Sequence, residues 1–389
     1  MKKSWVLILS ITLIFSLSVK NAKAQDAAVQ IFPDIKKQVI QSIGGNYCQA
    51  NYTDHAWDAI GEATLEEFRP THVRVALPMK LRGLNYNQYK DDAFTNQKIV
   101  LKVLEALKRM KVEYGVENFT ISVWNVPDEL VENPKARNKR IIKPEAYTEV
   151  IGMITEFLIK AKNEYDVEVD YFSFNESDGG YNILFSPEAT IVFFKQLSES
   201  LNESGLKTKF LWADTHKTVG TVEFATRVMA DKALWDDFGP LCFHSWWSEN
   251  ISDSEFERIA ALAKAWERPV WCSELGFDAM AHRTKGMNKT WDYGMRFAVI
   301  SYRMMKFAQV EVSQYWTWQN NYEIMSSDLE EKYPSYFVTR HHVRFLNNGT
   351  QVIHTLSSDE NILPLAGIHP DGKKVLHIIN RYKKPVAIQ

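Results

Sequence analysis

The sequence predicts an α/β fold, a (β/α)8 TIM barrel with a small β-sandwich-like appendage formed by both chain ends. First, short apolar runs typical of buried parallel strands alternate with stretches of helical periodicity, in eight units between residues 41 and 348. Second, eight units of this length fit a closed barrel better than an open sheet, and no Gly-rich phosphate loop follows the first strand. Third, short strand-like segments replace this alternation after Gly349.

Residues 1–24 have the pattern of a secretory signal peptide. Two lysines precede an apolar run over residues 5–19, and an Ala-Lys-Ala cleavage triplet ends at residue 24. The run is short for a membrane span, and no later stretch is long enough. We therefore expect a bacterial periplasmic or secreted protein, without a lipid anchor because no cysteine stands at the cleavage point.

Residues 25–40 are a lead-in to the barrel. Strands are expected at residues 29–32 and 37–43, and Gly44-Gly45 is expected to break the second one. The lead-in strands are expected to pair with a small β unit over residues 349–389. Its own short strands are expected at residues 351–356, 362–368, 374–379 and 385–388.

The barrel itself is expected over residues 41–348. Helices are expected where apolar residues recur on one face, at residues 55–68, 97–110, from 144 onward, 186–204, up to 229, 254–266, 291–307 and 334–346. After the first strand, the remaining barrel strands are expected at residues 72–77, 119–124, 171–176, 209–214, 240–246, 269–274 and 312–318.

Composition excludes some functions and leaves others open. The net charge of -2 over 389 residues gives no electrostatic reason to expect a nucleic-acid partner. Aromatic residues make up 13% of the chain, which suits sugar-binding platforms but equally a large barrel core. The three cysteines form no disulfide framework; Cys242 and Cys272 fit small core residues, and a single bridge between them stays open.

Two strands end in a glutamate, which is the main functional signal. Glu176 ends the run at residues 171–176, before Ser-Asp-Gly-Gly, and Glu274 ends the run at residues 269–274. The carboxyl ends of barrel strands carry the active site, and cleavage of a glycosidic bond needs two carboxyl groups. Each glutamate alone also fits a strand end that points into water, but both together in a barrel favour a glycosidase.

Other strand ends supply side chains for the same mouth of the barrel. The candidates for substrate binding are Tyr47, Arg74, Trp124, Asn175, His244, Trp246, Trp316 and Trp318. Each has a structural alternative: the arginine in a buried ion pair, the histidine as a satisfied strand-end residue, and the tryptophans in the barrel core.

The expected chemistry follows from the opposite positions of the two glutamate strands. Across the mouth their carboxyl groups can approach to about 5–5.5 Å, the spacing of a retaining glycosidase. Arg74 beside Glu274 would keep that carboxylate ionised, and repulsion would then keep Glu176 protonated. Asn175 would bond the 2-hydroxyl of a sugar.

A metal-dependent hydrolase is the alternative raised by Asp214 and His216. Such a barrel needs an H-x-H pair on its first strand, where this chain has Gln41 and Asn46 instead. We therefore expect neither a metal nor a cofactor. The sequence predicts no oligomeric state.

The strand-end residues Asn175, Glu176, Glu274 and Arg74 resemble the signature of clan A glycoside hydrolases. Residues 41–45, Gln-Ser-Ile-Gly-Gly, resemble the opening of glycoside hydrolase family 30. Residues 122–127, Ser-Val-Trp-Asn-Val-Pro, are similar to that family's Ser-Pro-Trp-Ser-Pro-Pro run, with a valine and an asparagine as departures.

The resemblance implies a secreted retaining β-glycosidase that acts on polysaccharides, with Glu176 as acid/base and Glu274 as nucleophile. It implies supporting roles for Asn175 and Arg74. It also implies β-linked substrates of the xylan, β-1,6-glucan or β-1,6-galactan type, and endo action is expected. A non-catalytic glycan-binding barrel of a polysaccharide-uptake system is the alternative from another functional class.

Overall fold

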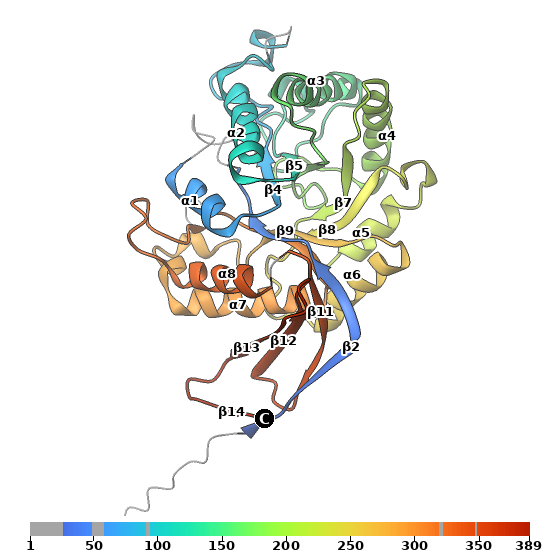
Figure 1. Ribbon diagram of the computed structural model, residues 1–389. Helices are drawn as coiled ribbons and strands as arrows, with labels where there is room; N and C mark the ends of the chain where they lie inside the picture. The colour runs from blue at the N-terminus through green and yellow to red at the C-terminus, as the bar shows by residue number, and fades with distance from the viewer. Residues whose placement is uncertain (1–25, 49–57, 91–93, 319–321, 347) are drawn as a thin grey trace, which may run out of the picture.

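The computed structural model describes residues 26–48, 58–90, 94–318, 322–346 and 348–389. Eight parallel strands form one sheet that curves into a barrel with helices around it, which confirms the predicted fold class (Figure 1). The predicted signal peptide at residues 1–24, and the first residues of the helix expected at 55–68, lie outside the described residues. No helix within the described ranges has the length and apolar character to cross a membrane.

The barrel strands follow one another around the barrel in chain order. They are β3 (Ser42–Gly45), β4 (His72–Ala76), β5 (Asn118–Val123), β6 (Tyr171–Phe174), β7 (Lys209–Thr215), β8 (Phe238–His244), β9 (Val270–Leu275) and β10 (Val310–Tyr315). Strand β10 pairs with β3 in parallel, so the last strand returns to the first. Just beyond β3, Asn46 pairs with Arg74 of β4, and Tyr47 N donates to Arg74 O at 2.8 Å. These contacts close the remaining seam.

The helices that surround the barrel are α1 (Ala59–Phe68), α2 (Lys98–Tyr114), α3 (Tyr147–Tyr165), α4 (Pro187–Glu203), α5 (Thr221–Val228), α6 (Asp253–Ala265), α7 (Trp291–Lys306) and α8 (Pro334–Phe345). Helix α4 begins as its sequence predicts, because the side chain of Ser186 accepts a hydrogen bond from Ala189 N and Pro187 occupies the first turn. The proline at residue 144 opens a short 3-10 turn, and α3 follows it.

Both ends of the chain form the appendage, a four-stranded antiparallel sheet. Its strands are β2 (Val29–Ile40), β11 (Thr350–Ser357), β12 (Ile362–Ile368) and β13 (Lys374–Asn380), in the order β13-β12-β11-β2. A second, two-stranded parallel pair joins β1 (Asp26–Ala27) to β14 (Ala387–Ile388). The early part of the chain therefore lies beside its late part (Figure 1).

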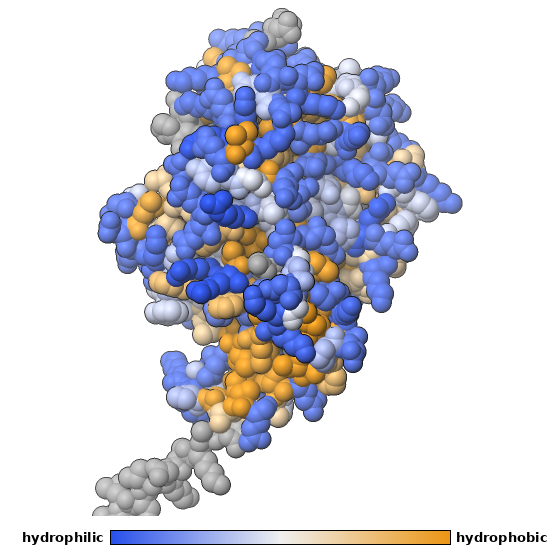
Figure 2. All heavy atoms as spheres, viewed as in Figure 1, coloured by the Kyte–Doolittle hydropathy of each residue, from blue (hydrophilic) through white to orange (hydrophobic). Residues whose placement is uncertain are grey.

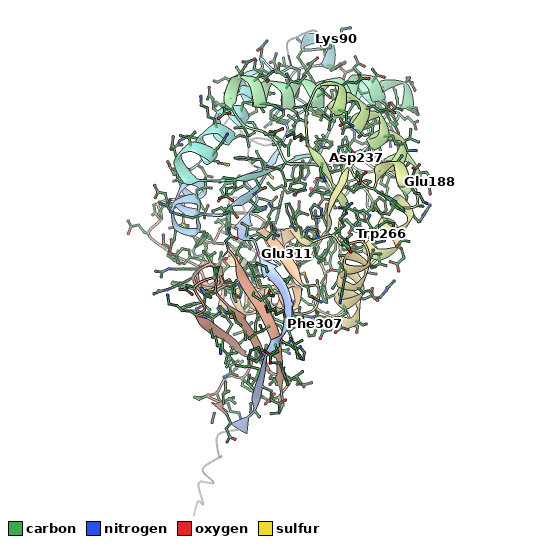
Figure 3. The ribbon with its side chains drawn as sticks, turned by 45° about the vertical axis from the view of Figure 1, so that its right-hand side comes forward. Lys90, Glu188, Asp237, Trp266, Phe307 and Glu311 are labelled. Atoms are coloured by element: carbon green, nitrogen blue, oxygen red, sulfur yellow. The ribbon has the colours of Figure 1, made fainter. Side chains whose placement is uncertain are left out.

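An apolar cluster connects the small sheet to the barrel. Ile40, Val352 and Leu365 from the sheet pack with Tyr302 and Met305 from α7. Figure 3 labels two residues at this junction: Phe307, which packs on the cluster, and Glu311 of β10, whose Oε2 accepts a hydrogen bond from Gln41 Nε2 at 2.7 Å. Apolar side chains also gather on the surface over the small sheet, below α7 and α8 (Figure 2).

Two expectations about the start of the chain were wrong. The lead-in is one continuous strand over 12 residues, with Pro33 tolerated because β2 is the edge of its sheet. Gly44 and Gly45 do not break a strand but lie within β3. A Cβ on Gly45 would come within 2.2 Å of the Trp318 ring, so this glycine permits close packing and makes no turn.

Candidate active site

The two glutamates meet at the carboxyl-terminal mouth of the barrel. Glu176 is the second residue after the end of β6, and Glu274 is the last residue but one of β9. One carboxylate oxygen of each, together with a ring nitrogen of His244, lie within 4.8 Å of one another. The sequence-based expectation that these carboxyl groups share one pocket therefore agrees with the geometry.

Glu176 is held in an unusual backbone conformation at the strand end. Its φ angle of 49° lies in the left-handed region, which non-glycine residues seldom adopt. The residue is 8% exposed, and its Oε1 lies 3.0 Å from His244 Nδ1. Burial raises the pKa of Glu176 above its usual value; the hydrogen bond with His244 opposes this, and the charge of Glu274 adds to it.

Glu274 has the opposite electrostatic environment. Arg74 Nη1 donates to its Oε1 at 2.8 Å, and Trp246 Nε1 donates to its Oε2 at 3.0 Å. Burial alone would raise the pKa of Glu274, but His244 and Arg74, by charge and hydrogen bonding, outweigh burial and lower it. The Glu274 carboxylate is thus held in its ionised form, whereas Glu176 favours the protonated form.

Arg74 is fully buried and connects the site to its surroundings. Besides Glu274, its guanidinium donates to Asn175 Oδ1 at 2.7 Å and to Asn46 Oδ1 at 3.0 Å. It also lies 4.7 Å from the centroid of the Trp124 ring, in cation–π contact. Arg74 is therefore both an ion-pair partner and a support for the site, so the two interpretations of this residue do not exclude each other.

His244 lies between the two glutamates. It is fully buried, and its Nδ1 is 3.0 Å from Glu176 Oε1 and 3.2 Å from Glu274 Oε2. Its Nε2 lies 3.3 Å from Asp214 Oδ1 in an ion pair, without a hydrogen bond between the two atoms. Burial opposes a charge on His244, but Glu274, Asp214 and Glu176 raise its pKa well above the usual value.

Asp214 belongs to the site around the two glutamates, although the sequence interpretation raises it only as a candidate metal ligand. It was considered only as a metal ligand beside His216, yet it is 1% exposed beneath His244. Its Oδ2 accepts from Ser173 at 2.7 Å and lies 3.3 Å from Arg74 Nη2. The signal was present: Asp214 ends a predicted strand, as Glu176 and Glu274 do. His216 instead pairs with Asp178, at 2.7 Å.

The predicted aromatic residues divide into two groups. Trp124 and Trp316 lie together at the mouth with ring centroids 5.8 Å apart, and Trp316 is partly exposed. Trp246 contacts Glu274, as described. Trp318 and Tyr47 belong instead to the main hydrophobic core; Trp318 packs on Phe68 and Tyr315. The structure gives these two residues a packing role.

A metal ion has one conceivable location among the described residues. Glu176, His244 and Glu274 could each offer a ligand atom. Arg74, however, already donates to Glu274 at 2.8 Å, and its positive charge disfavours a divalent cation there. The charges therefore fit a pair of glutamates better than a metal centre.

No family model and no curated protein matches this sequence. Solved structures do share its fold. SrfJ from Salmonella typhimurium has a TM-score of 0.74 at 16% identity, over 95% of this chain and 89% of that one. The family 30 subfamily 8 xylanase Xyn30A from Clostridium acetobutylicum has a TM-score of 0.70 at 16% identity, over 94% and 87%. An endo-β-1,6-glucanase has a TM-score of 0.70 at 14% identity, over 92% and 89%.

These similarities define the class of fold. The barrel with its appended sheet is the architecture of structures described as family 30 glycoside hydrolases, so the resemblance drawn from the sequence motifs is confirmed at the level of fold. At such low identity the comparison carries the fold alone. The chemistry has to be argued from the residues of this chain.

Proposed function

We propose that this protein is a secreted retaining β-glycosidase that hydrolyses β-linked glycans, with Glu274 as the nucleophile and Glu176 as the acid/base. The observation that carries the proposal is that one oxygen of the Glu176 carboxylate lies within 4.8 Å of one oxygen of the Glu274 carboxylate. Retaining enzymes hold their carboxyl groups about 5–5.5 Å apart, whereas inverting enzymes need about 6.5–9.5 Å to admit a water. The opposed pKa shifts of the two residues match their two roles.

In the first step, the ionised Glu274 attacks the anomeric carbon while the glycosidic C–O bond breaks. The leaving oxygen takes the proton of Glu176. In the second step, the Glu176 carboxylate removes a proton from water, whose oxygen attacks the same carbon. The ester bond to Glu274 breaks, the sugar leaves, and both glutamates return to their starting states.

The remaining residues suit the binding of a sugar ring. Arg74 fixes Asn175 through its Oδ1, which leaves the amide nitrogen as a donor for a 2-hydroxyl group. Trp124, Trp246 and Trp316 offer apolar faces at the same mouth. We propose substrates of the xylan, β-1,6-glucan or β-1,6-galactan type and endo cleavage, since a xylanase and an endo-β-1,6-glucanase share the fold.

The test is a screen of the purified protein against these polysaccharides, with product sizes and the anomeric form of the first product measured by NMR. We expect a ladder of oligomers with retained configuration. Glu274→Gln should abolish turnover, and Glu311→Gln, which changes a partly buried glutamate at the base of the appendage, should leave it intact.

Full activity of Glu274→Gln would refute the nucleophile assignment, and inverted product would refute the mechanism. Binding of a polysaccharide without any turnover would favour the glycan-binding barrel. Activity that disappears with a chelator and returns with Zn²⁺ would favour the metal-dependent alternative.

A further inference from the structure

Each ring nitrogen of His244 faces a carboxylate. Nδ1 lies 3.0 Å from Glu176 and 3.2 Å from Glu274, and Nε2 lies 3.3 Å from Asp214. A neutral imidazole carries a hydrogen on only one nitrogen and would turn the lone pair of the other toward a carboxylate oxygen. The geometry therefore suits an imidazolium, with a hydrogen on both nitrogens.

The charge of the pocket leads to the same conclusion. With Glu176 protonated, Glu274 and Asp214 contribute two negative charges, and Arg74 contributes one positive charge. Arg74, Asp214 and Glu274 are at most 3% exposed and Glu176 is 8% exposed, so an unbalanced charge would be costly. A positive charge on His244 makes the pocket neutral.

We propose that Asp214 is a positioning residue that keeps His244 doubly protonated, so that the Nδ1–H of His244 serves whichever of Glu176 and Glu274 carries the negative charge. The proposal rests on the proposed function for the roles of the two glutamates. The protonation state of His244 itself does not depend on those roles.

The reaction needs such a donor because the negative charge changes place. Before the first step the charge is on Glu274. After that step Glu274 is an ester, Glu176 is a carboxylate, and the pocket is still neutral if His244 is charged. His244 keeps both its protons throughout: Nδ1–H is hydrogen-bonded to Glu176 Oε1 and is also in ion-pair contact with Glu274 Oε2, so it faces the charge at either place without a proton transfer. The 3.0 and 3.2 Å distances show that it reaches both oxygens from one position.

The backbone and its neighbours hold Asp214 in place for this role. Ala213 and Asp214 have φ angles of 82° and 46°, and the register between β7 and β8 shifts at this point. Ser273 Oγ donates to Asp214 Oδ1 at 2.5 Å, and Ser173 Oγ donates to Oδ2 at 2.7 Å. Such local strain persists only where the surroundings fix it, and here it directs a carboxylate to Nε2.

The other titratable groups near His244 do not supply this charge balance. Cys242 on β8 and Cys272 on β9 are buried, which raises the pKa of both thiols and keeps them neutral. Arg74 on β4 also lies 3.3 Å from Asp214, so Asp214 could instead serve only the arginine. On the β6 side, Asp178 is already paired with His216. The experiment must therefore distinguish two roles of Asp214: pairing with Arg74 alone, and keeping His244 protonated.

The test is NMR of protein with ¹⁵N-labelled histidine, in which the His244 ring is assigned by its loss in His244→Gln. In the wild type we expect both ring nitrogens to remain protonated from pH 5 to pH 8. In Asp214→Asn we expect the ring to lose a proton within that range. Ser273→Ala is the matched control, because it removes a hydrogen bond to Asp214 but leaves its charge, and it should behave as the wild type.

A His244 ring with a single proton at pH 7 in the wild type would overturn the proposal, even if Asp214→Asn does not fold. So would an Asp214→Asn protein whose His244 stays doubly protonated, because Asp214 would then serve Arg74 alone. These measurements need no substrate, so they can fail independently of the proposed function. With a substrate in hand, Asp214→Asn should gain an alkaline decline in kcat at the pH where its His244 loses the proton.

Discussion

At the scale of single residues, the site shows how neighbours give two identical side chains different chemistry. Glu176 and Glu274 are both buried, and burial favours the neutral form of each. His244 and Arg74 together outweigh burial at Glu274 and lower its pKa, and Glu274 alone also accepts hydrogen bonds from Arg74 and Trp246. Protonation in this pocket therefore depends on which donors each carboxylate has.

Trp246 gives a test of this dependence. Trp246→Phe keeps an aromatic ring but removes the N–H that donates to Glu274 at 3.0 Å. Loss of a donor to the charged form raises the pKa of Glu274, so the acidic limb of the pH–activity profile should move to higher pH. The measurement is kcat/KM against pH on the substrate found in the screen.

Trp235→Phe is the control for this substitution. It also removes an indole hydrogen bond, from Nε1 to Met229 O at 2.9 Å, but at the opposite end of the barrel. Its pH profile should match that of the wild type. An acidic limb that stays in place in Trp246→Phe would mean that Arg74 and His244 determine the ionisation of Glu274 without Trp246.

The sequence could predict part of the site because strand ends in a barrel meet at one mouth. That rule places Glu176, Glu274, Arg74 and Asn175 together, and the structure does bring them into contact. It could not predict that Trp318 packs into the core, since a tryptophan near a strand end fits core and cleft equally. It also could not predict the contacts of Asp214, which depend on a local shift of register.

At the scale of elements, the predicted alternation is correct because hydrophobic period and turn residues agree along most of the chain. The disagreements arise where tertiary packing overrides a local signal. Gly44-Gly45 is a turn signal by itself, but Trp318 needs the space beside Gly45. The break expected within the lead-in is absent because β2 gains pairing with β11 along its length.

Gly45 and Gly152 are a matched pair for testing this explanation. A Cβ at Gly45 in β3 would overlap the buried Trp318 ring, so Gly45→Ala should lower the free energy of unfolding by about 1–3 kcal/mol. Gly152 in α3 has open space, so Gly152→Ala should raise it by about 0.5–1 kcal/mol through better helix propensity. Denaturant unfolding measures both, and a neutral Gly45→Ala would contradict the packing explanation.

At the scale of the whole molecule, the appendage is connected to the barrel both by the continuous chain and by a common apolar cluster. Strand β2 leads through one residue, Gln41, into the first barrel strand, and Ile40 packs with Leu365 and Met305. The small sheet therefore does not behave as a separate module attached by a linker. It covers one side of α7 with apolar residues from both chain ends.

Truncations test this dependence. A chain ending at residue 358 loses β12 and β13, and with them the buried Ile362 and Leu365. We expect a fall in the free energy of unfolding of at least about 3 kcal/mol, since each buried aliphatic side chain contributes about 1.5–3 kcal/mol. A chain ending at residue 380 loses β14 and the hydrogen bonds of the partly exposed Tyr382 to Asp359 and Asn361, but no buried side chain, and should unfold nearly as the full chain does. Equal stability of the two truncated chains would show that the barrel does not need the sheet.

The contact between the first and second barrel strands has a consequence for the proposed activity. Arg74 accepts the backbone hydrogen bond of Tyr47 across that gap, and its side chain at the same time reaches Glu274. If these strands part, the guanidinium is displaced and the attacking group loses its charge partner. We therefore predict that the proposed hydrolysis is lost when β3 and β4 separate, before any helix unfolds.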